Sequence, residues 1–310
     1  MKYILSTNAL KIIAVAAMVC DHIPYLSGTA LEDYYTFPVV SMHIVGRLTA
    51  PIFFYLAAVG YSRTGNVGKY LLRLFIFAMI SYIPFVWYFA GAPPWEGNYW
   101  RLNIIFTMLV GLALLWSVRE VKNIALKILC IAVCVLLGTF CDYGLFGIAC
   151  IFLFGMTEPI RAGLVSNAAP ADAGIAENAP YAETTGAPVF PGNTETGAYG
   201  IPAAMAPVKS AKLRFAGAYC ALVLVYSAYR VIELFTSASP GGAIIFLDEG
   251  VIMYMVVLLA KLLPLPLMLG HCLWQGAREP RPAFLGKWFF YIFYPAHICI
   301  LLFIRETILQ

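Results

Sequence analysis

Residues 69–90 read KYLLRLFIFAMISYIPFVWYFA, and this stretch decides the class of the protein. An α-helix of this length rises about 33 Å, which is enough to cross the ~30 Å hydrocarbon core of a bilayer. Its only charged residues, Lys69 and Arg73, lie near its beginning. The stretch therefore predicts a membrane-spanning helix that is entered from a basic connection.

The composition of the whole chain has the same character. Of its 310 residues, 62% are hydrophobic and only 12% are charged, whereas soluble domains carry about 45–50% apolar and about 25% charged residues. So little charge cannot cover a water-facing surface, which excludes a soluble enzyme, a disordered protein and a nucleic-acid binder for most of the length. The eight cysteines lie in or beside apolar runs without a CxxC pair, so we expect buried thiols and no metal site.

Apolar runs like this one recur along the chain. About nine are candidate spanning helices, near 8–26, 40–61, 69–90, 102–118, 124–141, 143–157, 212–235, 250–270 and 286–304. The first is expected to remain in the mature protein, because no small-x-small cleavage site follows it. We therefore predict an all-α, polytopic membrane helix bundle of about nine transmembrane helices.

The charges of the connections predict the orientation. Every second connection is basic, at 62–73, 118–127, 209–214 and 278–287, and the alternate connections are acidic or neutral. Basic connections stay on the cytoplasmic side, so the N-terminus is predicted to be cytoplasmic and the C-terminus outside. The net charge of +4 follows from these connections and does not indicate a nucleic-acid partner.

One segment departs from the apolar pattern. Residues 163–210 are rich in Ala, Pro, Gly, Thr and Asn and have no apolar period, which predicts a disordered cytoplasmic linker. This linker would divide the chain into a six-helix part, residues 1–162, and a three-helix part, residues 211–310. No internal repeat relates the two parts, which argues against an inverted-repeat transporter.

Ionisable side chains inside spanning helices are costly and usually face a protein interior or a wet cavity. Asp21 and His22, near the outer end of the first predicted helix, are therefore candidate functional residues. Because they are adjacent, they are expected to face different partners, and Lys11, eleven residues before His22, shares the face of His22. The alternative is an interfacial pair that only caps the helix in headgroup water.

His43 and Arg47 share one face of the second predicted helix at a spacing of i,i+4. Arg47 keeps its proton, so at this depth it requires an acidic partner or an anionic ligand. Asp21 lies at a similar depth on the neighbouring helix. A structural Asp21–Arg47 bridge and a contact from Arg47 to an oxyanion or acyl carbonyl both remain open.

Two further polar groups lie deep in predicted helices. In residues 294–297, YPAH, Pro295 frees a backbone carbonyl beside the mid-membrane His297. A hydrogen-bonded core histidine is the alternative. Asn103 shares a face with Thr107, and hydrogen bonds between helices would also explain both.

The connection 61–73 mixes glycines with cations on the predicted cytoplasmic side. Arg63, Asn66, Lys69 and Arg73 either belong to a positive-inside anchor or hold the phosphates of a soluble cytoplasmic donor. The sequence has no P-loop and no Gly-rich dinucleotide fingerprint, so ATP or NAD chemistry has no motif support. The GxSxG and HExxH motifs are also absent.

Taken in order, several short motifs of the chain resemble the TraX family of membrane proteins. They lie at residues 10–14, 21–23, 46–53, 60–74, 81–85, 102–107, 142–147 and 287–297. Each is weak alone, and their order and spacing carry the resemblance. It covers nearly the whole chain except residues 163–210, which have the character of an insertion.

The resemblance implies a multi-pass acyltransferase of the bacterial inner (plasma) membrane, with acetyl-CoA as the acyl donor, membrane lipid around it and no metal. The founding member of the family N-acetylates the N-terminal alanine of a conjugative pilin subunit. The resemblance does not fix the acceptor, which can be a protein, such as a pilin-like N-terminus, or a small molecule, and the acetyl group can go to nitrogen or oxygen.

Roles for the candidate residues follow as a hypothesis. His22 or His297 would act as the general base or carry the acyl group transiently. Arg47 would stabilise the developing oxyanion, and Asp21 would orient Arg47 or a histidine. The expected donor contacts are Arg63, Asn66, Lys69 and Arg73, and the expected substrate contacts are His43, Asn103 and Tyr294.

Two other classes of function remain open. A transporter or flippase would use the same buried charges without covalent chemistry, although Glu233 is the only clear acidic candidate on the late helices. A non-catalytic scaffold of a surface-structure assembly system would leave His22, Arg47 and His297 dispersed. Convergence of these three residues on one polar cleft open to the cytoplasm would favour the enzyme.

Overall fold

The structure is a computed structural model that describes residues 6–27, 36–97, 99, 101–157, 206–237, 249–272 and 288–308. Over these ranges the chain is helical, and apart from one isolated bridge between Leu102 and Cys141 no β-structure occurs in them. The predicted all-α class is therefore confirmed. Most of the predicted linker 163–210 lies outside the described residues, and its last five residues belong to a helix that begins at Ala206.

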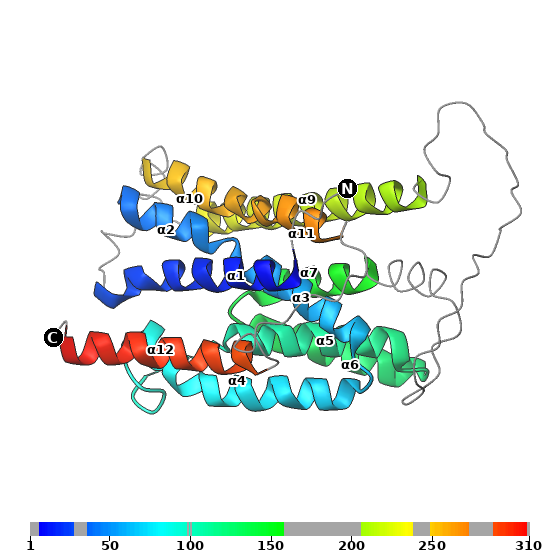
Figure 1. The fold of residues 1–310 in the computed structure, drawn as a ribbon, viewed down its shortest axis with the longest axis horizontal. Helices are drawn as coiled ribbons and strands as arrows, with labels where there is room; N and C mark the ends of the chain where they lie inside the picture. Colours follow the sequence, from blue (N-terminus) through cyan, green and yellow to red (C-terminus); the bar gives the residue numbers. More distant parts are fainter. Residues whose placement is uncertain are drawn as a thin grey trace, which may run out of the picture.

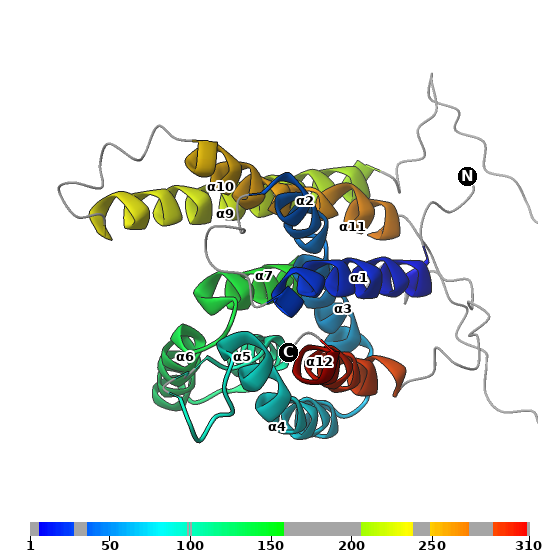
Figure 2. The same ribbon diagram turned by 90° about the vertical axis from the view of Figure 1, so that its left-hand side faces the viewer.

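The helices, in chain order, are α1 (Thr7–His22), η1 (Ile23–Ser27), α2 (Phe37–Gly46), α3 (Thr49–Arg63), α4 (Val67–Ala90), α5 (Ile104–Glu120), α6 (Ile124–Thr139), α7 (Gly144–Thr157), α9 (Ala206–Ser237), α10 (Glu249–Leu259), η5 (Ala260–Leu262), α11 (Pro264–Cys272) and α12 (Phe289–Ile308). They form three layers, which are seen end-on in Figure 2. One outer layer holds α2, α9, α10 and α11, the middle layer holds α1, α3 and α7, and the other outer layer holds α4, α5, α6 and α12.

Five helices of the described chain are long and apolar enough to cross a membrane. They are Thr7–Leu26, Phe37–Arg63, Val67–Ala90, Leu213–Glu233 and Phe289–Thr307. Other predicted spans are also helical but shorter, among them Ile124–Thr139, Gly144–Thr157 and Tyr254–Gly270. The protein is thus a membrane protein, while the number of nine spans stays a prediction.

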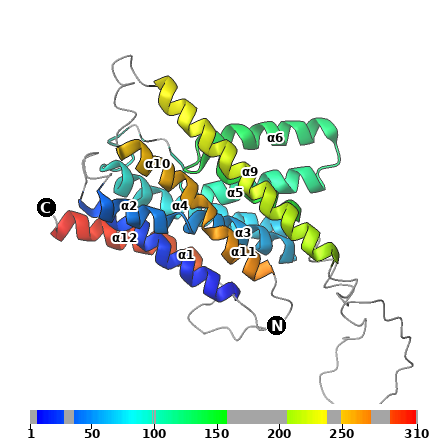
Figure 3. The same cartoon turned by 90° about the horizontal axis from the view of Figure 1, so that it is seen from above.

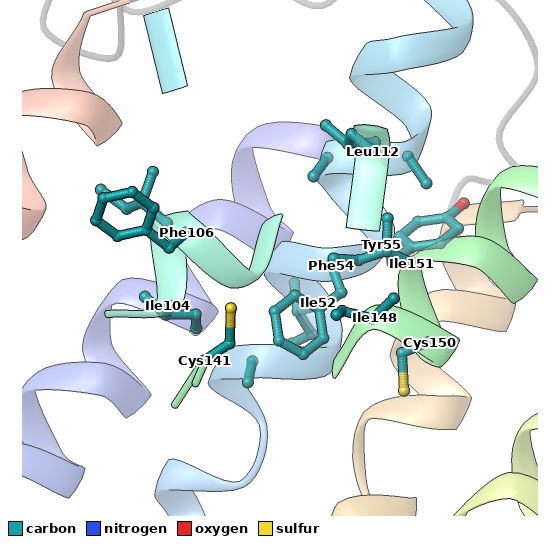
Figure 4. Packing of buried hydrophobic residues seen from close by; sticks show 14 of the residues in the cluster. Ile52, Phe54, Tyr55, Ile104, Phe106, Leu112, Cys141, Ile148, Cys150 and Ile151 are labelled. Atoms are coloured by element: carbon teal, nitrogen blue, oxygen red, sulfur yellow. The ribbon is translucent and has the colours of Figure 1, made fainter. Parts of the chain in front are cut away.

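Small residues let the middle of the bundle pack closely. A methyl group at Gly111 of α5 would overlap Ile151, and one at Gly155 of α7 would overlap Leu115. The backbones of α5 and α7 therefore approach each other closely, as small residues allow between membrane helices. Large apolar side chains of α3, α5 and α7 fill the space around this contact, and Figure 4 shows Tyr55, Leu112 and Ile151 among them.

Two predicted helices are broken, and proline explains both breaks. The predicted helix 40–61 is interrupted at Arg47 and Leu48, because Pro51 has no N–H to donate to the Arg47 carbonyl. The predicted helix 250–270 is interrupted by η5, because Pro264 likewise cannot donate to the Ala260 carbonyl.

Of the predicted basic connections, 62–73, 118–127 and 209–214 lie at one end of the bundle, and 278–287 lies outside the described residues. The helix ends at Arg63, Glu120, Thr157 and Cys272 point toward the right-hand end of Figure 1. His22 and the C-terminal ends of α4 and α12 lie toward the other end, and α9 crosses over the bundle in Figure 3. The described basic connections thus share one end, and which end faces the cytoplasm stays a prediction.

Candidate functional site

A cavity of about 360 Å³ lies where both helix breaks meet the end of α1. Its charged lining residues are Asp21, Arg47, Arg101, Asp142, Arg230 and Lys261. Its lining also includes His22, Thr49 and the tyrosines Tyr25, Tyr99, Tyr143, Tyr226, Tyr254 and Tyr294. Irregular backbone is tolerated within a membrane where it lines such a cavity, so the breaks and the cavity explain each other.

Two histidines form a hydrogen-bonded relay at the cavity wall. His297 Nδ1 lies 3.0 Å from the Phe293 carbonyl oxygen, which can only accept, so Nδ1 carries the proton and Nε2 is an acceptor. His22 Nδ1 lies 2.9 Å from His297 Nε2 and must therefore be the donor. In the neutral relay, His22 Nε2 is left with a lone pair, as a general base requires.

The relay is held in place by its neighbours. The Tyr88 hydroxyl donates to the His22 carbonyl oxygen at 2.7 Å. The ring of Phe89 meets the His22 imidazole edge-on, with the centroids 5.1 Å apart, and Phe293 stacks on His297 at the same distance. The geometry of both imidazoles is thus fixed before any substrate binds.

Asp21 faces a different partner from His22, as its adjacent position predicts. Its Oδ1 lies 2.8 Å from Nδ1 of His43, which is 1% exposed. Gly46 makes room for this pair, because a methyl group there would overlap the Asp21 carboxyl group. Arg47 follows Gly46 and interacts electrostatically with Asp21, so Asp21, His43 and Arg47 form one charged cluster.

Asp142 is brought to the cavity by the turn between α6 and α7. The Asp142 N–H donates to the Leu102 carbonyl oxygen, and the Leu102 N–H donates to the Phe140 carbonyl oxygen, both at 2.8 Å. This short ladder holds Asp142 beside Arg101. Burial raises the pKa of the Asp142 carboxyl to about 6, against the opposing effect of the Arg101 and Arg47 charges. The carboxyl can therefore exchange a proton near neutral pH.

Lys261 belongs to the site although the sequence analysis did not select it. It lies on η5, and the Tyr219 hydroxyl donates to its carbonyl oxygen at 2.6 Å. The signal was present in the sequence, because Lys261 is the one charged residue of the apolar run 250–270 and precedes Pro264 by three residues. A charge beside a proline inside an apolar run marks a helix break at a polar cavity.

Arg230 is a second lining cation that the sequence pattern does not single out, although the pattern does single out Glu233. Arg230 Nη1 donates to Glu233 Oε2 at 2.6 Å, and Arg230 Nε donates to the Tyr254 hydroxyl at 3.0 Å. The bond to Tyr254 joins α9 to α10 at the cavity. Glu233, the candidate coupling carboxylate of a transporter, is thus the partner of a lining arginine.

Asn103 does not lie where the predicted contact with a substrate would require it. It is fully buried and does not line the cavity. Its Oδ1 accepts from the backbone N–H groups of Ile105 and Phe106, and its Nδ2 donates to the Ala78 carbonyl oxygen at 2.9 Å. Asn103 therefore caps α5 and fastens it to α4.

This placement predicts the effect of Asn103→Ala. The variant loses the cap and leaves the Ala78 carbonyl without its side-chain donor, so we expect a stability loss of about 1–3 kcal/mol with the substrate KM unchanged. Asn123→Ala is the matched control, because Asn123 caps α6 at an exposed position through the Leu126 N–H. Thermal unfolding in detergent measures both, and a smaller loss for Asn103→Ala than for Asn123→Ala would contradict the assignment.

The predicted donor residues lie away from the cavity. Arg63 ends α3, and Asn66 caps α4 by accepting from the Lys69 N–H at 2.8 Å. Arg73 packs over the Tyr70 ring and lies near Tyr291 of α12. These four residues do not line the cavity. The length of α3, about 22 Å, separates Arg63 from the helix break.

The contact between one face of α1 and α12, which we call the seam, runs from that basic end to the histidines. Lys11 Nζ lies 4.7 Å from the Phe290 ring centroid, and His22 of the same helix bonds His297. Lys11 and His22 therefore share the face of α1 that meets α12, as their spacing predicts. Along α1 they are about 16 Å apart, with Arg73 and Tyr291 beside the seam.

The structure thus brings together one part of the predicted site. Asp21, His22, Arg47 and Tyr294 line the cavity. His43 and His297 bond to the first two of these. The arrangement places a base and several cations on the wall of one cavity, which is suited to proton abstraction and to stabilising a developing oxyanion.

Comparisons with known proteins agree with the membrane architecture and with the resemblance. A family model described as TraX protein matches residues 6–177. The probable fimbrial assembly protein FimC, serogroup H1, from Dichelobacter nodosus is 29% identical over 146 residues, which are 46% of this chain and 58% of that protein. The chain therefore matches less than two thirds of this relative's length. No solved structure matches the chain significantly.

Proposed function

Because this chain belongs to the TraX family, we propose that it is a membrane acyltransferase that works in the cavity beside His22. The observation that carries the proposal is the histidine relay, which leaves a lone pair on Nε2 of His22, a residue that lines the same cavity as Arg47. A neutral imidazole with a lone pair can accept a proton, as a general base must.

The proposed reaction has one transfer step. The acceptor amine or hydroxyl gives its proton to His22 Nε2 and attacks the acyl carbonyl carbon. Arg47 stabilises the oxyanion that forms. The carbon–sulfur bond then breaks, and the thiolate leaves and takes the proton back from His22. His297 stays neutral and holds His22 in the productive tautomer through its Nε2.

We propose acetyl-CoA as the donor, with its phosphates at the basic end of the bundle. An extended thioester arm would follow the seam of α1, α4 and α12 from Lys11 and Arg73 to the histidines. The thioester end of the donor then reaches the His22 side of the cavity from the basic end of the bundle. On this route the 61–73 connection binds the donor phosphates and does not touch the reacting atoms.

The donor route predicts the effect of Arg73→Ala. Removing one guanidinium–phosphate contact is expected to raise the KM for acetyl-CoA about tenfold, because a hydrogen bond to a charged group contributes about 1.5–3 kcal/mol. Lys122→Ala is the control, since Lys122 is exposed and lies in another basic connection. Acetyl transfer measured at several acetyl-CoA concentrations gives the KM of each variant. Equal KM values for the two variants would contradict the route.

The acceptor is proposed to belong to a surface structure. The relative's name assigns it to fimbrial assembly, and the family resemblance points to a pilin-like N-terminus. Transfer would take place in the bacterial inner membrane, where the cavity would meet the acceptor as it leaves the lipid or the outer side.

Membranes that contain the protein, incubated with radiolabelled acetyl-CoA, test the proposal. Label is expected in a membrane or surface component, and it should be absent from membranes without the protein. The broken helices around a charged cavity are also typical of a transporter. Uptake or flipping of a solute with no labelled product would favour that alternative and contradict the acyltransferase.

A further inference from the structure

The surroundings of Lys261 set it apart from the other lining cations. Lys261 is 5% exposed, and its Nζ lies 5.7, 5.4 and 5.3 Å from the ring centroids of Tyr143, Phe146 and Tyr226. Among the described residues, this nitrogen has neither a hydrogen-bond acceptor nor an ion-pair partner. Three aromatic rings therefore hold a buried ammonium group whose donors are still available.

A buried charge is costly unless it is paired. Aromatic faces compensate part of that cost, but an ammonium group has three N–H donors and rings are weak acceptors. Because Lys261 lines the cavity, an oxygen-rich anion in the cavity would supply the missing acceptors. Tyr219 holds the Lys261 backbone through its carbonyl oxygen, so the ammonium group is positioned in advance.

The charge of the cavity wall agrees with an anionic ligand. Four cationic side chains and two carboxylates line it. Arg230 is paired with Glu233, and Asp21 is engaged by His43. Arg47 lies close enough to Lys261 for their charges to repel each other, and the Asp21 and Asp142 carboxylates offset part of this repulsion. Two cations held together in this way are stabilised by a shared anion.

We propose that Lys261 and Arg47 form an anion-binding subsite that takes a phosphate or carboxylate group of the acceptor. This proposal rests on the proposed function and narrows it, because the acceptor is then an acidic molecule. The anion belongs to the acceptor rather than to the donor, since the donor phosphates are assigned to the basic end, about 16 Å from His22 along α1.

Binding of inorganic phosphate and acetate to the purified full chain in neutral detergent tests the subsite without any acyl transfer. Lys261→Met keeps the length of the side chain and removes the charge, and phosphate affinity should fall about 10- to 100-fold. Lys122→Met, at an exposed position, should bind phosphate like the wild type. Lys261→Arg keeps the charge and should retain most of the affinity.

Two results of the binding experiment would overturn the subsite. One is wild-type affinity for phosphate in Lys261→Met. The other is a wild-type protein that binds neither phosphate nor acetate. If Lys261→Met does not fold, Lys261→Gln provides the same test with a polar side chain.

A second experiment identifies which molecule carries the anion. Acetyl transfer in membranes is measured with acetyl-CoA and with S-acetyl-N-acetylcysteamine, a thioester without phosphates. An acceptor subsite predicts that Lys261→Met lowers transfer from both donors by a similar factor. A loss confined to acetyl-CoA would overturn the assignment to the acceptor. Phosphate binding by a wild-type protein that transfers no acetyl group would contradict the acyltransferase and leave the anion subsite standing.

Discussion

His22→Ala is expected to lose about 10²- to 10⁴-fold in the rate of acetyl transfer, which is the usual contribution of a positioned general base. The substitution removes the lone pair that the relay leaves on His22 Nε2, together with the contacts of its ring with Phe89 and His297. Transfer of label from acetyl-CoA in membranes measures the effect, and the amount of inserted protein should match the wild type.

Ser117→Ala is the matched control for this variant. Ser117 is buried in α5 and donates to the Ala113 carbonyl oxygen of its own helix, away from the cavity. Its removal should leave transfer unchanged. Full activity of His22→Ala at normal protein levels would refute His22 as the base and would move the chemistry elsewhere.

Gly46→Ala is expected to disrupt the site with a single methyl group. The new Cβ would occupy the position of the Asp21 carboxyl group, so Asp21 must leave His43 or α1 must move away from α2. Overpacking of this kind costs about 1–3 kcal/mol of stability, and acetyl transfer should fall at least about tenfold as Arg47 and His22 shift.

The control for that variant is Gly217→Ala in α9. Nothing lies within 4 Å of a methyl group at Gly217, and alanine favours a helix over glycine by about 1 kcal/mol. Gly217→Ala should therefore be neutral or slightly stabilising. Thermal unfolding and transfer assays on both variants decide, and wild-type behaviour of Gly46→Ala would show that the Asp21–His43 pair is not needed.

The sequence could predict the helices because apolar runs and loop charges act locally. Residues 69–90 became α4 with nearly the expected ends. The prolines at 51 and 264 also indicated the two breaks. Hydropathy averaged over an apolar run, however, does not detect the loss of a single N–H donor. Residues 40–61 and 250–270 each form one apolar helical span as predicted, but each span is interrupted near its middle.

The candidate site was predictable only in part, for a similar reason. Asp21, His22 and Arg47 are ionisable residues inside apolar runs, so each could be selected individually. Their pairing could not, because it depends on how α1 meets α2 and α12. The sequence left Arg47 and a histidine open as partners of Asp21, and its carboxylate hydrogen-bonds His43 and interacts electrostatically with Arg47.

The convergence of distant segments on the cavity has a consequence for evolution and for engineering. The family model ends at residue 177, yet the relay partner His297 and the cage around Lys261 draw on residues beyond it. Relatives collected by the first half alone can therefore be sorted by whether their last helix carries a histidine after a proline. Two separately expressed halves of the chain should regain acetyl transfer only when they assemble. Acetyl transfer would then measure how much of the protein has reassembled.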